Sequence, residues 1–527
     1  ASNNTAMGYN AGTAVTTGTE NTVVGALAGD AITTGNENTA VGKTALSADT
    51  KGHRSVAIGQ GTLATQNFTS STNSYNTAVG FQAGNAVTTG TLNTFIGALS
   101  GDAVTTGGQN TALGQNSLGS NTTASNNTAI GYVALVANTT GASNVAVGAS
   151  SLDANTEGSN NTGVGFNALT SNTTAAGNTA VGYNSLAANT TGASNTAVGS
   201  GALDASTTGA SNVAVGLNSM TSNTNGYENT AVGKDSLASC TEGFENTAIG
   251  HNCGAAITTG DNNTFVGNAA GQANTTAGAN TAVGNAALAS NTTGATNNAF
   301  GANALDACTT GARNNGFGYR ALASATTGYY NTAIGHQAGD DITDGFKNIC
   351  IGHDADISAG NNQHTIVIGE SITAASNDFS FGKASNVVTN DFDTDANWSR
   401  SSDERLKKNI TNQTLGLDFI NDLRTVKYNW KASNELDSTD AELSHLYKED
   451  AADNEMNTSA VMHNFIAQEV KAALDTAGVS EFGGWKEDQY GVQQVSREMF
   501  VIPLVKAVQE LSTKLDAALA RITTLEG

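Results

Sequence analysis

The sequence has little of what most chains of its length contain. Its 527 residues include a single proline and four cysteines, and only 13% are charged and 6% aromatic. Scarce proline and low charge both argue against disordered low-complexity sequence. They also exclude collagen, which needs abundant proline and glycine at every third position. Four cysteines in so long a chain do not make a disulfide framework.

Basic residues and long apolar runs are also missing. The formal net charge is -23, so the chain has no basic stripe with which to bind nucleic acid. No run approaches the roughly 18 apolar residues of a membrane span. The first residues are polar, so no signal peptide is visible. We therefore expect no nucleic-acid partner and no membrane span.

The charge that is present is distributed unevenly. Residues 1–400 carry 24 acidic and 9 basic side chains, whereas the much shorter stretch 401–527 carries 21 and 13. The only proline, Pro503, and two of the three tryptophans also lie in this second part. The composition predicts a rod over residues 1–385, a linker over 386–401 and a different kind of domain over 402–527.

What the first part has in abundance is a repeat. The pentapeptide Asn-Thr-Ala-Val-Gly recurs with small variations, and its closing glycine marks the register. From Gly8 to Gly382 there are 23 such glycines, and all but two of the intervals between them have a length of 17. The interval from Gly59 to Gly80 is longer by four, and the last interval is shorter by four. A fixed register over this length predicts a solenoid rather than a disordered linker.

One unit illustrates the expected coil. Residues 195–198 alternate, which places Thr196 and Val198 on one face and Ala197 on the other. Because other copies have valine or isoleucine at both positions of the first face, we expect that face to be buried. Leu186 supplies a second apolar point, and residues 190–192 are typical of a turn. Such short coils stack about 4.8 Å apart.

These repeats resemble the head repeats of trimeric autotransporter adhesins. The stretch Ser-Val-Ala-Ile-Gly at residues 55–59 is similar to the motif of that family. The resemblance implies a trimeric parallel β-roll over residues 1–385. The period of 17 is longer than in the familiar adhesin heads.

The second part has patterns of its own. Residues 415–423 have helical spacing, and Val426, Tyr428 and Trp430 alternate as in a strand. Residues 433–457 are polar and acidic, which is typical of an exposed excursion, and residues 463–470 open another helix. The end is a heptad pattern that predicts a coiled coil over about 500–527. Its apolar positions are Leu504, Val508, Leu511, Leu515, Ala518, Ile522 and Leu525.

Taken together, this part resembles the intramolecular chaperone domain at the C-terminus of phage endosialidases and other tail fibres, peptidase family S74. The resemblance lies in Ser-Asp-Glu-Arg-Leu-Lys at 402–407, Leu-Arg-Thr-Val-Lys-Tyr-Asn-Trp-Lys at 423–431, Ile-Ala-Gln-Glu-Val at 466–470 and the terminal heptads. Thr425 and Asn464 depart from the family pattern, which commonly has proline and glycine there. The implied fold is mostly β: a β-solenoid followed by a small α+β chaperone domain ending in a coiled coil.

The same resemblance implies autoproteolysis between Ser402 and Asp403, with Ser402 as nucleophile and Lys407 as base. A serine hydroxyl needs a nearby base, and lysine serves when burial disfavours its charged form. A turn over residues 403–406 would bring the two side chains together. The chain would then be at most a single-turnover serine autopeptidase. His463, Gln468 and Glu469 are candidates for supporting positions, although His463 also fits simple polarity at a helix start.

Other signals are weaker. Asp391, Asp393 and Asp395 suggest a calcium loop, but Ala396 and Ser402 replace the glycine and glutamate that an EF-hand needs. An acidic group in the rod would suit either a bound ion or solvated turns, with solvated turns as the default interpretation. It comprises Asp340, Asp341, Asp344, Asp354 and Asp356. Cys240 and Cys308 share a repeat phase four coils apart, too far to bridge, and are expected to fill the core. We expect no cofactor and no metal.

Three functions fit these observations. The first is a phage tail fibre or spike in the virion tail: a homotrimer that binds a host cell-surface receptor or glycan, with a chaperone that directs trimerisation. The second is a trimeric adhesin on a bacterial surface. The third is an ice-binding solenoid, suggested by threonine ladders such as Thr190 and Thr191. Carboxylate pairs are too sparse in the rod for a glycosidase.

Overall fold

The structure is a computed structural model of the chain. It describes residues 2–391, 399–400, 402, 404–449, 458–459 and 461–527. The chain divides into two compact units, residues 1–401 and residues 402–527, and each is described by itself.

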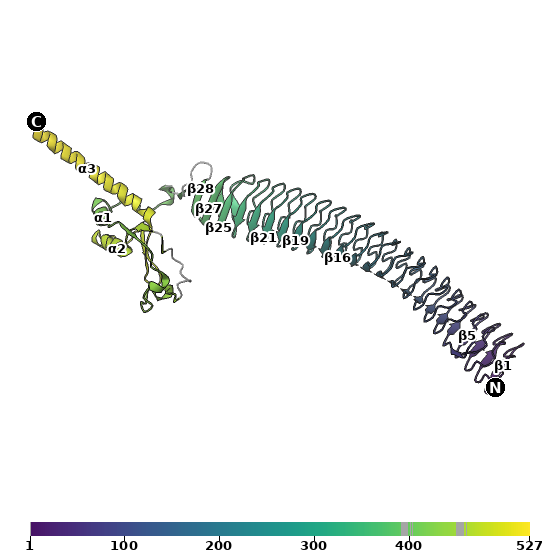
Figure 1. Cartoon of the computed structure of the whole chain (residues 1–527). Helices are drawn as coiled ribbons and strands as arrows, with labels where there is room; N and C mark the ends of the chain where they lie inside the picture. Colours follow the sequence, from purple (N-terminus) through teal and green to yellow (C-terminus); the bar gives the residue numbers. More distant parts are fainter. Residues whose placement is uncertain (1, 392–398, 401, 403, 450–457, 460) are drawn as a thin grey trace. The chain divides into compact units, whose positions relative to one another are not determined.

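The first unit is a solenoid whose coils each contribute one short strand to a single ladder along a gently curved rod (Figure 1). The strands of this ladder are β1 (Thr5–Met7), β2 (Thr22–Val24), β3 (Thr39–Val41), β5 (Val56–Ile58), β7 (Thr77–Val79), β8 (Thr94–Ile96), β9 (Thr111–Leu113), β10 (Thr128–Ile130), β11 (Val145–Val147), β12 (Thr162–Val164), β13 (Thr179–Val181), β14 (Thr196–Val198), β15 (Val213–Val215), β16 (Thr230–Val232), β17 (Thr247–Ile249), β18 (Thr264–Val266), β19 (Thr281–Val283), β20 (Asn298–Phe300), β21 (Asn315–Phe317), β22 (Thr332–Ile334), β23 (Ile349–Ile351), β25 (Ile366–Glu370) and β27 (Asp378–Lys383). The predicted solenoid of 17-residue repeats is confirmed.

The register of the ladder repeats the period of the sequence. Neighbouring strands run parallel, and Thr196 of β14 lies opposite Val213 of β15, one repeat period further along the chain. Backbone hydrogen bonds also join coils outside the strands, as from the N–H of Leu186 to the carbonyl of Ala202 at 3.0 Å. Every coil is therefore bonded to the next around its circumference.

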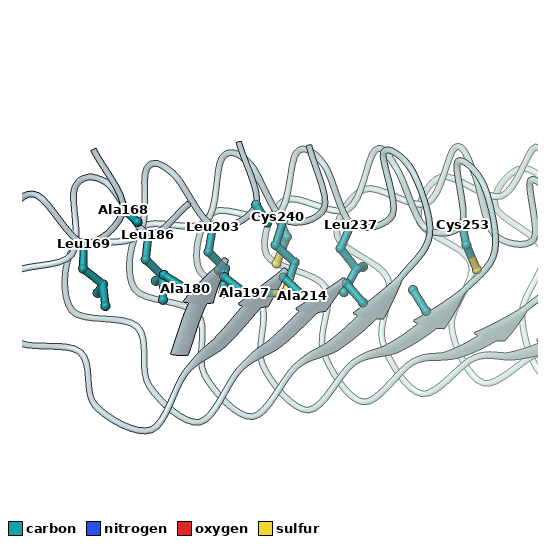
Figure 2. Close-up of a cluster of buried hydrophobic side chains, with 14 of the residues drawn as sticks. Ala168, Leu169, Ala180, Leu186, Ala197, Leu203, Ala214, Leu237, Cys240 and Cys253 are labelled. Atoms are coloured by element: carbon teal, nitrogen blue, oxygen red, sulfur yellow. The ribbon is translucent and has the colours of Figure 1, made fainter. Parts of the chain in front are cut away.

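The core of the rod lies on the opposite side of each strand from the one we predicted. From the second coil onward, the residue two places before the closing glycine points inward: Ala197 is fully buried, whereas Val198 is 37% exposed. Figure 2 shows leucines such as Leu169, Leu186 and Leu203 reaching from the opposite wall toward the strand alanines. Most coils hold one alanine and one leucine inside, and where Phe95 or Phe265 replaces the strand alanine, glycine replaces the neighbouring leucines. The larger valines and isoleucines therefore face outward.

A buried asparagine holds most coils to their neighbours. The backbone N–H of Asn195 donates to the Oδ1 of Asn178 at 2.9 Å, and the backbone N–H of Asn212 donates to the Oδ1 of Asn195 at 3.0 Å. The Asn195 Nδ2 donates to the carbonyl of Gly209 at 2.8 Å. Because buried polar groups need partners, this ladder satisfies backbone groups that a turn would otherwise leave unpaired inside the rod.

The closing glycine is required by both conformation and space. Gly199 has φ +142°, and a Cβ there would lie 2.3 Å from the carbonyl oxygen of Gly216 in the next coil. No other residue type adopts this conformation readily. Glycine therefore recurs in the sequence because the backbones of adjacent coils lie so close together at this position.

The rod has two local departures. The longer coil between β5 and β7 adds a short parallel pair, β4 (Gly52–His53) with β6 (Thr72–Asn73). At the other end, β24 (Ala355–Ile357) pairs with β26 (Ile372–Ala374). Strands β28 (Asn386–Asp391) and β29 (Ser399–Arg400) then continue the sheet, β28 running antiparallel to β27 and β29 antiparallel to β28. Residues 386–391, which we predicted as linker, are therefore a strand, because Val387 and Val388 pair across the last coil.

The second unit is small and mixes helices with short strands. Its elements are η1 (Glu404–Leu406), α1 (Leu417–Asn421), β30 (Val426–Tyr428), η2 (Ser433–Glu435), η3 (Ser444–Leu446), β31 (Met462–Asn464), α2 (Ala467–Thr476), β32 (Trp485–Glu487), β33 (Gln493–Val495), η5 (Arg497–Phe500) and α3 (Val501–Glu526). Strands β30 and β31 pair antiparallel, as do β32 and β33. The predicted helix at 463–470 begins only at Ala467. Residues 462–464 are instead a strand, because they pair with β30.

The core of this unit gathers apolar residues from its helices. Phe419 of α1, Val470 and Leu474 of α2, and Phe500 of η5 are buried together. The Glu510 carboxylate of α3 accepts a hydrogen bond from the backbone N–H of Leu417 at 2.8 Å, which ties α3 to the start of α1. No helix in the described part of the chain is long and apolar enough to cross a membrane.

The asparagine ladder predicts a local stability effect. Asn195→Ala leaves the backbone N–H of Asn212 and the carbonyl of Gly209 buried without these partners. We expect the free energy of local opening to fall by about 3 kcal/mol. Hydrogen exchange measured by mass spectrometry over residues 178–229 reports this as faster exchange. The exposed Thr191→Ala in the same coil is the control, and equal exchange in the two variants would contradict the role of the ladder.

Candidate functional site

The start of the second unit brings Ser402 and Lys407 together. The Lys407 Nζ lies 2.7 Å from the Ser402 Oγ and donates a hydrogen bond to it. The turn between them is the short helix η1, and the backbone N–H of Lys407 donates to the carbonyl of Glu404 at 3.0 Å. Asp403, the other side of the predicted junction, lies outside the described residues. The arrangement can pass a proton between a serine hydroxyl and a lysine amine.

The surroundings of this pair are open in the single chain. Ser402 and Lys407 are both exposed. Two apolar side chains next to them in sequence, Leu406 and Ile410, are 70% and 63% exposed. Lysine acts as a base only where its surroundings disfavour the charged ammonium. A protein surface that covers Leu406 and Ile410 would provide apolar surroundings that disfavour the charged ammonium of Lys407.

The three predicted supporting residues lie elsewhere in this unit. His463 is in β31, and Gln468 and Glu469 are in the first turn of α2. Among the described residues, no hydrogen bond or ion pair joins any of the three to Ser402 or Lys407. Their support for the site within one chain therefore remains a prediction.

Glu469 has a partner that its sequence position did not reveal. Its carboxylate forms an ion pair with the guanidinium of Arg424, and the Arg424 Nε lies 3.1 Å from the Glu469 Oε2. The hydrogen bond from Arg424 holds the pKa of Glu469 below its ordinary value. This pair joins the segment after α1 to α2 across the surface.

His463 lines a shallow pocket. A cavity of about 440 Å³ lies beside β30 and β31, and its lining residues are Thr425, Val426, Lys427, His463, Asn464, Phe465 and Arg497. Thr425 and Asn464, the two departures from the family pattern, are both among them. The pocket is separate in sequence from Ser402 and Lys407.

The acidic group in the rod contains one buried carboxyl. Asp356 is 5% exposed, and its carboxylate accepts hydrogen bonds from the backbone N–H groups of Asp341 and Ile357 at 2.9 and 2.7 Å. Burial raises the pKa of Asp356 to about 7, and the nearby Asp340 and Asp341 add to the rise. The Asp356 carboxyl therefore holds a proton at mildly acidic pH. Because Asp356 is buried, the acidic cluster is not simply a set of solvated turns, which was our default interpretation.

The four cysteines are free and buried, as expected for Cys240 and Cys308. Cys308 Sγ donates to the carbonyl of Gly311 at 3.4 Å, at a position where other coils have a second buried asparagine, such as Asn189. Burial raises the pKa of Cys240 to about 11 and that of Cys308 to about 12. Thiols in this state are poor nucleophiles and fill space in the core.

In the threonine ladder, the first residue of each pair bonds to the next coil, whereas the second, such as Thr191, is exposed. The Thr190 hydroxyl donates to the carbonyl of Thr207 in the next coil at 3.0 Å. The same bond recurs from Thr139 to Thr156 and from Thr292 to Thr309. The first threonine of each pair thus has a role in coil stacking, which accounts for its recurrence without ice binding.

Fold and geometry together define a β-solenoid rod followed by a small α+β domain that begins at a serine–lysine pair. Comparison with protein families identifies this domain: residues 402–479 match the family described as the chaperone of endosialidase, Peptidase_S74. The C-terminal unit therefore carries a chaperone-of-endosialidase domain. Neither the curated proteins nor the solved structures include a match to the chain.

Asp356 predicts an unusual pH dependence for the rod. A carboxyl whose pKa is higher in the folded chain than the ordinary 3.8 stabilises the fold fully below about pH 4. That stabilisation is lost as pH rises through about 7. Asp340→Asn removes a neighbouring negative charge and donates to Asp356, so the pKa of Asp356 should fall. We expect the thermal midpoint of the variant to change less between pH 5 and pH 8 than that of the wild type.

The matched control is Asp344→Asn, an exposed position in the same coil whose carboxylate accepts from the hydroxyl of Thr343. Its pH profile should parallel the wild type. If Asp340→Asn also gave a parallel profile, the coupling between Asp340 and Asp356 would be wrong.

Proposed function

We propose that the chain is the subunit of a phage tail fibre or spike, located in the virion tail. Three copies form the rod, and the C-terminal domain directs their trimerisation and then separates by self-cleavage. The observation that carries this proposal is the order of the two units: a long solenoid is followed directly, at Ser402, by a segment that matches the chaperone-of-endosialidase family. Domains of this family are typical of phage tail fibres and spikes.

An apolar stripe along the rod supports association with further copies. The residue before every closing glycine is valine, isoleucine, leucine, methionine or phenylalanine, and it lies on the outward face of its strand. Those with the most exposed side chains are Met7, Ile58, Ile96, Leu113, Val181, Val198, Ile249, Phe300, Phe317, Ile334, Ile368 and Phe381. Large exposed apolar patches mark interaction sites. Because the stripe has the length and period of the rod itself, a copy of the same chain fits it best.

The terminal helix supports the same conclusion. Leu511, Leu515, Ile522 and Leu525 of α3 are at least half exposed in the single chain. With Ala518 included, the steps between them alternate between four and three, the pattern that left-handed coiled coils bury between helices. A coiled coil at the C-terminus would set three chains in register before the rods form. This lowers the entropic cost of aligning long coils.

The cleavage reaction that we propose is an acyl transfer from the Ser402–Asp403 peptide bond. Neutral Lys407 takes the proton of a Ser402 hydroxyl, and the oxygen attacks the Ser402 carbonyl carbon. The Asp403 nitrogen leaves with the proton from Lys407, and an ester remains. Water then hydrolyses the ester, which gives the Ser402 carboxylate and restores the serine hydroxyl that attacked.

Assembly and cleavage are linked by this chemistry. Attack within one chain closes a four-membered ring, whereas attack by the Ser402 hydroxyl of a neighbouring copy does not. Covering Leu406 and Ile410 in a trimer would also remove water from Lys407 and favour its neutral form. Cleavage would thus follow trimerisation, so the chaperone domain is released only after the three chains have assembled.

Receptor binding would use the outer surface of the rod. Stacked aromatic pairs lie on adjacent coils, including Phe166 with Tyr183 and Tyr329 with Phe346, whose ring centroids are 5.8 and 4.9 Å apart. Arg313 lies over the ring of Tyr330 beside the second pair. Exposed aromatic rings with flanking cations suit a host cell-surface glycan.

Denaturing gel electrophoresis after folding tests the proposed cleavage. We expect the wild type to yield two fragments, residues 1–402 and 403–527. Ser402→Ala and Lys407→Ala should each reduce the fragments to less than about 1% of the wild-type amount, because a nucleophile or its base is lost. Lys408→Ala, an adjacent exposed lysine, should be cut normally. An intact wild-type chain, or equal loss in the Lys408 variant, would refute self-cleavage by this pair.

A further inference from the structure

We propose that His336, His353 and Asp354 form a binding site for a divalent transition-metal ion, with Zn²⁺ as the representative ion. The three side chains come from two adjacent coils near the C-terminal end of the rod. One ligand atom from each lies within 4.8 Å of the other two. This site is independent of the chaperone domain and of the proposed fibre function.

The solenoid itself positions the ligands. His336 and His353 each follow a closing glycine, and they are one repeat period apart, so they occupy the same place in consecutive coils. Strands β22 and β23 pair in register immediately before them. The backbone N–H of Asp354 donates to the carbonyl of His336 at 3.0 Å, which fixes the aspartate of one coil beside the histidine of the other. The backbone thus sets the spacing of the ligands before any ion binds.

The ligand atoms point toward one region. The Nδ1 of His353 lies 3.2 Å from the Asp354 Oδ2, and the Nδ1 of His336 lies 4.0 Å from the Asp354 Oδ1. Ligands at about 2.0–2.2 Å from a tetrahedral zinc are roughly 3.3 Å from one another. Of the three ligand pairs, the one between His353 and Asp354 already has this separation. The other two are within 4.8 Å, and the two imidazole rings must turn out of their parallel stack to share one ion.

The imidazoles contact their neighbours mainly through their ring faces, which leaves the ring nitrogens at the edges. The rings of His336 and His353 stack with centroids 5.1 Å apart and planes at 10°, and Tyr319 packs on the other side of His336. The three side chains remain about half exposed, at 46%, 54% and 43%. Solvent therefore reaches the site, and water can complete the coordination.

The donor set selects the class of ion. Two imidazole nitrogens and one carboxylate suit Zn²⁺, Cu²⁺ or Ni²⁺, whereas Ca²⁺ and Mg²⁺ require mainly oxygen ligands. Three protein ligands and an open position are typical of zinc sites that bind a further group. The sequence signal for this site is the recurrence of histidine at one repeat phase, which is visible only after the period is known.

Equilibrium dialysis of the full chain against Zn²⁺, followed by metal analysis, tests the site. We expect one zinc per chain at micromolar free Zn²⁺. His336→Ala and His353→Ala should each weaken binding at least tenfold, and Asp354→Asn should also weaken it. Circular dichroism should show folded protein for all three, because the side chains are surface groups. Co²⁺ in place of zinc should give a visible absorption band that is lost in the histidine variants.

His251 is the matched control, because it follows a closing glycine in the same way but has Asn268 rather than a second histidine beside it in the next coil. His251→Ala should leave zinc binding unchanged. The proposal is overturned if the wild type does not bind zinc, if the double variant of His336 and His353 binds it equally, or if His251→Ala causes the same loss. One zinc per three chains would also overturn it, because the site lies within one chain.

Discussion

A buried asparagine that donates and accepts hydrogen bonds in nearly every coil is the interaction on which the rod depends. The exceptions are the coils with Ser55, Thr365 and Asp378 at this position. Asn195 bonds to the coil before it and the coil after it, and its counterparts one repeat period away do the same. Where one coil is four residues longer, the connection is kept by a substitute. The Nδ2 of Asn76 donates to the Oε1 of Gln66, and the Gln66 Nε2 donates to Ser55 Oγ, at 2.8 Å in both cases. In this longer coil, an amide from the added residues therefore takes the place of the ladder.

The narrowness of the coil explains much of the rest. Because most coils hold only one alanine and one leucine inside, the apolar residue before the closing glycine stays outside, as Val198 illustrates. A single chain thus has an exposed stripe along the rod and another along α3. We interpret both as surfaces for further copies. The serine–lysine pair lies at the first residues of the domain that would register those copies. The protein we propose is one in which assembly precedes the loss of the assembling domain.

The sequence predicts the repeat period, the strands, the closing glycines and the long terminal helix, because each appears as a regular spacing of residue types. The buried face could not be predicted, because the rule that larger apolar residues point inward fails in so narrow a coil. Leu186 was correctly expected in the core, but its φ of +52° was not, because leucine disfavours that conformation and only tertiary packing imposes it. The asparagine ladder was missed because asparagine is also a turn residue. The pairing of Ser402 with Lys407 was implied by the family resemblance, and a turn across their five-residue spacing allowed it. The positions of His463 and Glu469 depended on strand pairing and an ion pair that leave no local pattern.

The most direct test of this account is the molar mass of the full chain in solution by sedimentation equilibrium. Ser402→Ala keeps the domains joined and is the appropriate form to measure. The account predicts a stable species of three times 53.1 kDa at micromolar concentration, because the stripe and α3 are covered only when copies associate. A monomer of 53.1 kDa that remains soluble at that concentration would contradict it.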